Sequence, residues 1–226
     1  MKKELNPPRR GEATRDALLV AATKVFARDG FHAASLRDIA GAAGINQALI
    51  GYHFRHKEGL YLAVFEHIVV QVSQRIGPIA DEIDAALKTP QGALDRQARI
   101  DLYLPPLLRL ADGLVALMAS HASDDWGQLI LREQQAPTAA FSIFFDGVMR
   151  RVSALMTELV QRLRETDSPA EARMLVVAIL GQVLVFRAAR AGVTRLMEWE
   201  HIGASELGVI RARIHRTIEA LLVNGG

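Results

Sequence analysis

The sequence of residues 35–57, SLRDIAGAAGINQALIGYHFRHK, decides the fold of the N-terminal part of the chain. Ser35, followed three residues later by Asp38, forms a capping-box pattern that predicts the start of a short helix. Gly44 predicts the end of that helix, because glycine readily adopts the left-handed backbone of a tight turn. Asn46 can cap a second short helix directly afterwards. Two short helices joined in this way predict a helix-turn-helix.

The second short helix has a polar outer face. We expect Leu49 and, by the spacing, Ile50 or Phe54 to point inward, which leaves the opposite face to a groove of DNA. Asn and Gln side chains hydrogen-bond to base edges, Ala contacts a thymine methyl group, and Tyr, His and Lys suit phosphates. A plain helical hairpin in a bundle is the alternative. The candidate DNA-binding residues are Arg37, Asn46, Gln47, Ala48, Tyr52, His53 and Lys57.

Positive charge is concentrated at this end of the chain. Residues 1–60 hold ten Lys and Arg against six Asp and Glu, so in a chain of net charge +2 the remaining residues 61–226 carry −2. A basic head suits a polyanionic partner such as nucleic acid. Half of the 226 residues are hydrophobic and the net charge is small, which excludes intrinsic disorder.

Several other classes of protein do not fit the sequence. The chain has no cysteine, so it has no disulfide, thiolate metal site or cysteine nucleophile, which fits the reducing cytoplasm. The longest run without a charged residue, 39–54, is short and partly polar, so we expect no membrane span. GxGxxG, Walker and HExxH motifs are missing, so we expect neither an enzyme nor a cofactor. Two spacings, His53–His56 and Glu198–His201, superficially suggest a metal, but we expect none.

Helical periodicity runs through almost the whole chain, and strand signals are scarce. We therefore predict an all-α fold, with an N-terminal three-helix helix-turn-helix domain and a larger α-helical ligand-binding and dimerisation domain. The predicted division is a flexible basic tail over residues 1–13, a DNA-binding domain over residues 14–60 with its helix-turn-helix at about 35–54, and an effector-binding and dimerisation domain over residues 61–226.

Residues 14–65 resemble the DNA-binding domain of TetR-family transcriptional regulators. The matching stretches are Ala21-Ala22, Phe26-Ala27, Gly30-Phe31, SLRDIA at 35–40, AGI at 43–45, YHF at 52–54 and KEGLY at 57–61. One departure is Gly51, where many members carry Tyr or Asn. The resemblance implies a sequence-specific regulator that binds a double-stranded DNA operator.

The C-terminal part carries a second resemblance. Residues 126–141, residues 181–190 and Trp199 resemble the C-terminal domain of the CecR/CerR subgroup of that family. This implies a homodimer and a small-molecule effector. We predict a cytoplasmic repressor that is released from a near-palindromic operator when the effector binds the C-terminal domain. An all-helical small-molecule carrier or sensor without DNA binding is the alternative.

Glu133 falls on the apolar face of a predicted helix, because it lies seven residues, or about two turns, after Trp126. A buried carboxylate is costly without a partner, so we expect Glu133 to pair with Arg187 or Arg190. Such a pair could line an effector pocket or be purely structural. The candidate effector-pocket residues are Met118, His121, Trp126, Ile130, Glu133, Phe141, Phe145 and Arg187, although the aromatic ones and His121 also fit an ordinary core.

Residues 171–189 are apolar nearly all round, which predicts a helix buried on every side. A small domain can rarely bury such a helix alone, so we expect a second subunit to cover it. In the resembled family, two late helices of each subunit form a four-helix dimer interface, which here would be residues 138–165 and 169–190. The candidate interface residues are Val148, Val152, Leu155, Leu159, Leu175, Ile179, Gln182 and Phe186.

Overall fold

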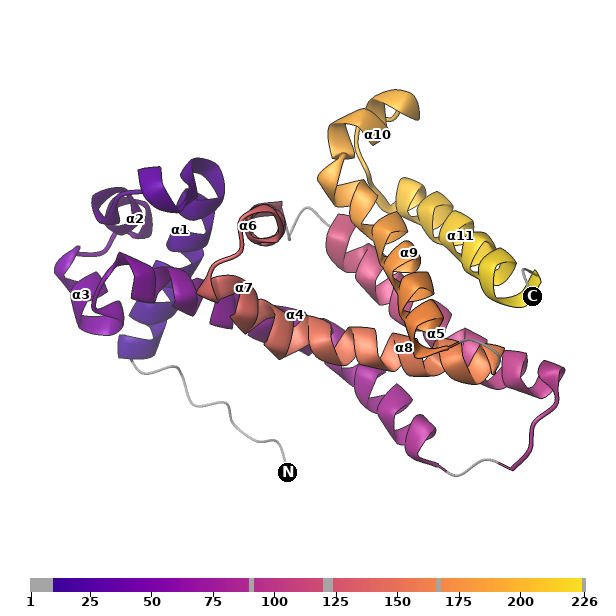
Figure 1. Ribbon diagram of the computed structural model, residues 1–226. Coiled ribbons are helices and arrows are strands. Elements are labelled where there is room, and N and C mark those ends of the chain that lie inside the picture. The colour runs from indigo at the N-terminus through magenta and orange to yellow at the C-terminus, as the bar shows by residue number, and fades with distance from the viewer. Residues whose placement is uncertain (1–9, 90–91, 120–123, 166–167, 225–226) are drawn as a thin grey trace, which may run out of the picture. The chain divides into compact units, whose positions relative to one another are not determined.

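A computed structural model describes residues 10–89, 92–119, 124–165 and 168–224 of the chain (Figure 1). Within these ranges every regular element is a helix, so the predicted all-α fold is confirmed. Residues 1–9 of the predicted tail, and His121, lie outside the described residues.

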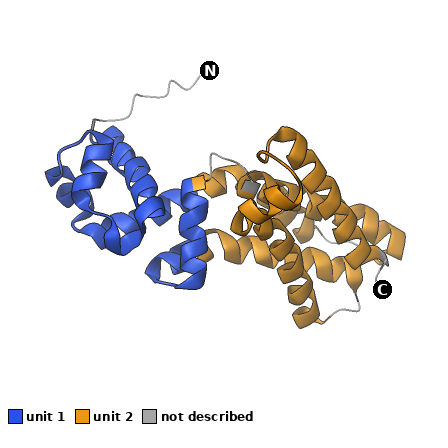
Figure 2. Cartoon of the chain, turned by 90° about the horizontal axis from the view of Figure 1, so that it is seen from above, with its two compact units in different colours: residues 1–70, 125–144 blue, residues 71–124, 145–226 orange. Residues whose placement is uncertain are grey.

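The helices form two compact units, which Figure 2 colours separately. Unit 1 comprises residues 1–70 and 125–144, and unit 2 comprises residues 71–124 and 145–226. The sequence predicted one boundary after residue 60. The structure instead joins a distant segment of the chain to the N-terminal helices.

Unit 1 contains three N-terminal helices, the first turns of a long fourth helix, and two helices of the distant segment. They are α1 (Arg10–Ala33), α2 (Leu36–Ala43), α3 (Ala48–Phe54), the start of α4 (Lys57–Lys88), α6 (Asp124–Gln135) and α7 (Ala139–Phe144). Residues 10–13, which we expected in the tail, therefore belong to α1. Each of the first four helices contributes a fully buried side chain to the core, namely Phe26, Ile39, Ile50 and Phe65.

Gly30 interrupts the regular geometry of α1 near its end. Its φ of 79° and ψ of 169° lie in a region that residues with side chains strongly disfavour. A Cβ atom at this position would lie 2.7 Å from a guanidinium nitrogen of Arg132 in α6. A residue without a side chain therefore permits both the bend in α1 and the close approach of α6.

Unit 2 is built from longer helices. Its elements are the rest of α4, α5 (Arg96–Ala119), a π-helical turn (Phe145–Met149), α8 (Arg150–Arg164), α9 (Pro169–Ala188), α10 (Arg190–Leu196), α11 (Ala204–Glu219) and a second π-helical turn (Ala220–Asn224). Helix α8 packs against α5 and α9, and α11 packs against α5. Ser168 and Glu171 form the capping box that begins α9, because each side chain accepts a hydrogen bond from the other residue's N–H.

Within the subunit, α9 is buried on one side only. Val176, Ile179 and Val183 are buried, whereas Met174 is 69% exposed and Val177 is 61% exposed. Among the described helices, α9 is the one whose length and composition would permit it to cross a membrane. Its packing against α5 and α8 is that of a helix at the surface of a bundle, with one apolar face left open.

We expect Gly30→Ala and Gly51→Ala to change stability in opposite directions. Alanine at Gly30 must adopt a positive φ and displace the Arg132 guanidinium, which should lower the free energy of unfolding by about 1–3 kcal/mol. Alanine at Gly51 meets no atom within 4 Å and lies inside α3, so it should raise that free energy by up to ~1 kcal/mol. Urea unfolding of both variants beside the wild type measures the difference, and two equal losses would contradict it.

Candidate DNA-binding surface and its supports

The turn between α2 and α3 has the geometry that the sequence predicted. The Ser35 hydroxyl accepts a hydrogen bond from the Asp38 backbone N–H at 3.0 Å and so caps α2. Gly44 follows α2 in the left-handed region, with φ 65° and ψ 29°. The Ile45 N–H then donates to the Ala40 carbonyl at 3.0 Å. These local bonds fix where α3 starts relative to α2.

Helix α3 buries one face and exposes the other. The Asn46 side-chain oxygen accepts a hydrogen bond from the Ala48 N–H at 2.9 Å and caps the start of the helix, as predicted. Ile50 and Phe54, four residues apart, are buried together. The prediction that Leu49 points inward is wrong, because it is 38% exposed. It directly precedes Ile50 and therefore lies about 100° around the helix from the buried pair.

The exposed face of α3 brings most of the predicted DNA-binding residues together. Asn46, Gln47 and Ala48 are exposed at the start of the helix. Tyr52 follows one turn after Ala48 and is 80% exposed, and its ring lies edge-on to that of His53, with 5.1 Å between the ring centres. A continuous outer surface of polar, small and aromatic groups results.

The two predicted cations outside α3 behave differently from each other. Arg37 of α2 is exposed. Lys57, at the start of α4, is half-buried: its ammonium group donates to the His32 carbonyl at 3.0 Å and lies 4.9 Å from the centre of the Phe31 ring. Lys57 therefore ties the start of α4 to the end of α1, a structural contact that the sequence did not reveal.

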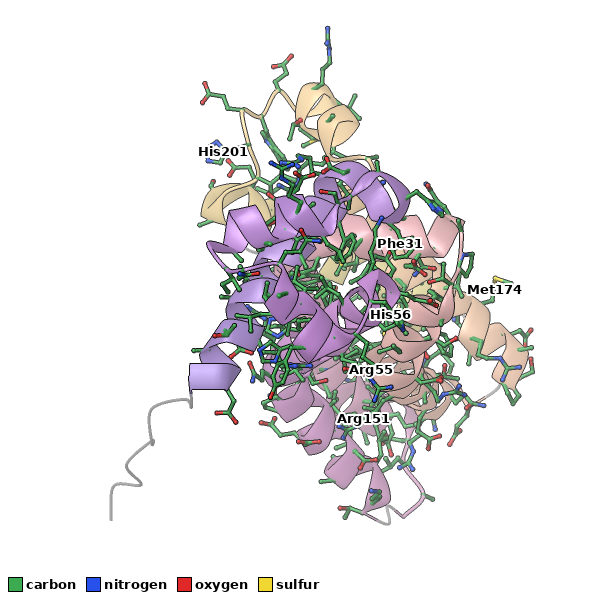
Figure 3. All side chains as sticks on the ribbon, turned by 90° about the vertical axis from the view of Figure 1, so that its left-hand side faces the viewer. Phe31, Arg55, His56, Arg151, Met174 and His201 are labelled. Carbon is green, nitrogen blue, oxygen red and sulfur yellow. The ribbon has the colours of Figure 1, made fainter. Side chains whose placement is uncertain are left out.

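Arg55 is a candidate phosphate-binding residue that the sequence analysis missed. Its φ of 67° and ψ of −59° are those of a strained γ-turn, in which the His56 N–H donates to the Phe54 carbonyl at 2.8 Å. This turn connects α3 to α4 and leaves the Arg55 side chain exposed (Figure 3). His56 in turn caps α4, because its Nδ1 accepts a hydrogen bond from the Gly59 N–H at 3.0 Å. The sequence feature that could have identified Arg55 was its position as a basic residue at the junction of two predicted helices.

Glu133 is buried, as expected, but its partners differ from the expected ones. It is 4% exposed. One carboxylate oxygen accepts a hydrogen bond from the Tyr61 hydroxyl at 2.9 Å, and the other accepts from the Thr138 N–H and hydroxyl at 2.8 and 2.9 Å. The predicted ion pair with Arg187 or Arg190 is therefore wrong, since donors from α4 and from the start of α7 satisfy this carboxylate.

Arg187 and Arg190 bind Asp124 instead. One nitrogen of each guanidinium lies near the same Asp124 oxygen, at 2.5 Å for Arg187 and 3.3 Å for Arg190. The Arg187 side chain is only 7% exposed, and this burial lowers the pKa of its guanidinium, although the hydrogen bond to Asp124 opposes the shift. The sequence analysis named these two arginines as partners of Glu133, whereas the acid that they meet is Asp124.

The predicted effector-pocket residues are divided between the two units. Trp126, Ile130, Glu133 and Phe141 belong to unit 1, and Met118, Phe145 and Arg187 belong to unit 2. Each unit also has a cleft of a size that suits a small molecule. The cleft in unit 1, of about 560 Å³, is lined by Phe31, Tyr61 and Glu133 among others. The cleft in unit 2, of about 690 Å³, is lined by Arg99, Tyr103 and Arg162 among others.

Most of the predicted dimer-interface residues are buried inside the subunit. Val148, Val152, Leu155, Leu159 and Ile179 are all buried, and Leu175, Gln182 and Phe186 are half-buried. Buried side chains have little surface left to contact a second copy, so the predicted set of interface residues needs correction. The face of α9 that remains open is formed by Met174, Val177, Ala178, Gly181 and Val185.

Two family models match the chain. The model of bacterial regulatory proteins of the tetR family matches residues 18–64. The model of the C-terminal domain of the HTH-type transcriptional dual regulator CecR matches residues 106–225. These matches confirm the resemblances that the motifs of the two parts predicted.

Curated relatives and solved structures agree with these matches. CecR of Shigella flexneri is 28% identical over 215 residues, which are 94% of this chain and 93% of the relative. A TetR-family regulator from Mesorhizobium loti has a TM-score of 0.62 at 17% identity, covering 95% of this chain and 98% of the other. FadR of Bacillus subtilis, solved with stearoyl-CoA, has a TM-score of 0.60 at 16% identity, covering 92% and 97%. At these identities, the solved structures show a shared fold.

We expect Ser35→Ala to lower the free energy of unfolding by about 1 kcal/mol, because the Asp38 N–H loses its capping partner. Ser35→Thr keeps the hydroxyl and should cost less. Urea unfolding followed by circular dichroism measures both variants. A Ser35→Thr variant as unstable as Ser35→Ala would show that the hydroxyl does not cap α2.

Proposed function

Because the chain belongs to the TetR family of bacterial regulatory proteins, we propose that it is a repressor that binds a near-palindromic DNA operator and leaves it when a small molecule binds. The observation that carries this proposal is the exposed face of α3, where Asn46, Gln47 and Ala48 stand on a helix anchored by buried Ile50 and Phe54. The protein acts in the cytoplasm as a regulator rather than as an enzyme.

The chemistry of α3 suits the major groove. The Gln47 amide can both donate to and accept from an adenine edge, and the Ala48 methyl group can meet a thymine methyl group. The Asn46 oxygen caps α3, so Asn46 can offer its NH2 group to a base as a donor. Base contacts concentrate at the N-terminal end of a recognition helix, where these residues lie. Arg37 and Arg55, both exposed, supply charge for phosphates on either side.

A homodimer presents two such helices to the two half-sites of an operator. Half-sites read by a two-fold dimer lie one or more helical turns apart, at ~34 Å per turn. The open apolar face of α9 supports this assembly, because Met174 and Val177 expose large side chains to water in a single subunit. We place the two-fold contact on this face of α9 rather than on the residues that the subunit buries.

The effector binds in the helical body and acts by favouring one of two states of the dimer. It lowers DNA affinity only if its affinity for the two states differs. FadR of Bacillus subtilis, which has a similar fold, was solved in complex with stearoyl-CoA, and this supports a small-molecule effector for the present chain. Within the helical body we retain the predicted residues of unit 2, Met118, Phe145 and Arg187, as candidate wall residues, and we assign Glu133 a different role below.

We expect Gln47→Ala to weaken binding to the operator by about 1–3 kcal/mol and to relax the base preference at one position of each half-site. The operator is the duplex that the wild-type chain selects from a random library, and fluorescence anisotropy measures the affinity. Gln74→Ala, an exposed glutamine of α4 in unit 2, is the matched control and should bind as the wild type does. Equal affinity of both variants would place the reading surface elsewhere.

The same variants distinguish the mode of regulation. Transcription in vitro from a promoter that overlaps the selected operator should fall when the wild-type chain is added, and Gln47→Ala should repress less. More transcript with the wild-type chain would contradict the repressor assignment. Failure to select any duplex would favour a helical small-molecule carrier.

We expect Val177→Glu to convert the homodimer into monomers, because it places a charge in the centre of the open face of α9. Val177 is 61% exposed, so the subunit itself should still fold. Val20→Glu, on the half-exposed outer side of α1, is the matched control and should leave the dimer intact. Sedimentation equilibrium gives both masses, and a dimeric Val177→Glu variant would exclude this face.

A further inference from the structure

The segment of residues 125–144 belongs to unit 1, which contains α3, although the rest of that unit is residues 1–70. It contains nearly all of α6 and the whole of α7. In the chain order, α5 precedes this segment and the π-helical turn Phe145–Met149 and α8 follow it, and all three belong to unit 2. The segment is thus covalently continuous with the helical body at both ends, yet it packs with α1 and α4.

Glu133 makes the first of the contacts that hold the segment. Its carboxylate is 4% exposed and accepts hydrogen bonds from Tyr61 of α4 and from the N–H and hydroxyl of Thr138. Burial, together with the bond to Glu133, raises the pKa of the Tyr61 phenol, so the phenol keeps its proton and remains a donor. A buried carboxylate bonded in this way resists displacement, because any donor it loses leaves a desolvated charge unsatisfied.

Arg132, the preceding residue, makes the second contact. Its Nη2 donates to the Ala27 carbonyl of α1 at 3.1 Å, and its Nη1 occupies the space beside Gly30. A cation next to carbonyls at the C-terminal end of a regular helical stretch is favourable. Two adjacent residues of α6 therefore form hydrogen bonds to two different helices: Arg132 binds α1 and Glu133 binds α4.

The parts of α1 and α4 that α6 binds lie next to the contacts that join the end of α1 to the start of α4. Lys57, at the start of α4, binds the His32 carbonyl at the end of α1, and the Phe31 and Tyr61 rings lie 5.0 Å apart, centre to centre. Only Arg55 and His56 separate the end of α3 from the start of α4. The placement of α3 therefore follows the placement of the start of α4.

We propose that Arg132 and Glu133 are positioning residues that hold α1 and α4 in the arrangement in which α3 fits DNA. We call Arg132, Glu133, Tyr61 and Thr138 the α6 clamp. This role presupposes the DNA-binding function proposed above.

Three variants of the full-length protein test the clamp: Tyr61→Phe, Glu133→Gln and the double variant. Tyr61→Phe removes one hydroxyl group, and Glu133→Gln keeps the shape of the side chain but replaces one accepting oxygen by a donor. Each should weaken binding to the selected operator at least about fivefold at a temperature well below unfolding. The double variant should lose less than the product of the two single losses, because both act on one contact. Gln128→Ala, an exposed residue of α6, is the control and should bind as the wild type does.

Amide hydrogen exchange supplies a readout that does not depend on DNA. Exchange at residues 27–34 and 57–62 should accelerate in the Tyr61→Phe and Glu133→Gln variants, while α9 and α11 keep wild-type rates. Variants that melt at lower temperature but keep wild-type operator affinity would show a purely structural role and overturn the proposal. If the wild-type chain selects no operator, the proposed function fails, and unchanged exchange at residues 27–34 and 57–62 would then overturn the clamp separately.

Discussion

The carboxylate of Glu133 imposes a constraint that organises unit 1. A carboxylate that is 4% exposed needs hydrogen-bond donors from the protein, since little of its surface meets water. Those donors come from Tyr61 in α4 and from Thr138 at the start of α7, so satisfying one side chain fixes three elements relative to each other. Arg132 also binds the end of α1. Together these two adjacent residues make nearly all of α6 a part of unit 1, although the helices before and after the 125–144 segment belong to unit 2.

The helix-turn-helix could be predicted from sequence because its determinants are local. The caps at Ser35 and Asn46 and the left-handed turn at Gly44 each depend on atoms within a few residues, and all three occur as predicted. Periodicity identified Ile50 and Phe54 as candidates for the buried face but also included Leu49. A seven-residue helix has too few turns for periodicity alone to fix its orientation, and packing against the other helices decided it.

Contacts distant in sequence could not be predicted in the same way. The apolar pattern around Glu133 correctly indicated burial. The arginines that follow the apolar run 174–186 were a poor guide to its partner, because Tyr61 is 72 residues away from Glu133 and is a neutral donor. Likewise, the composition of α9 indicated a helix with apolar surface on all sides. It did not show which side α5 and α8 cover, so the predicted interface included Ile179, which the subunit itself buries.

The central claim is that the chain reads duplex DNA through α3, with basic side chains on phosphates around it. The salt dependence of operator affinity tests this claim most directly, because every phosphate neutralised by a Lys or Arg contributes about −0.9 to the slope of log K against log salt concentration. The account predicts a steep linear fall with salt for the selected operator, together with weaker binding to a scrambled duplex of equal length. An affinity that does not change with salt, or that is equal for both duplexes, would contradict it.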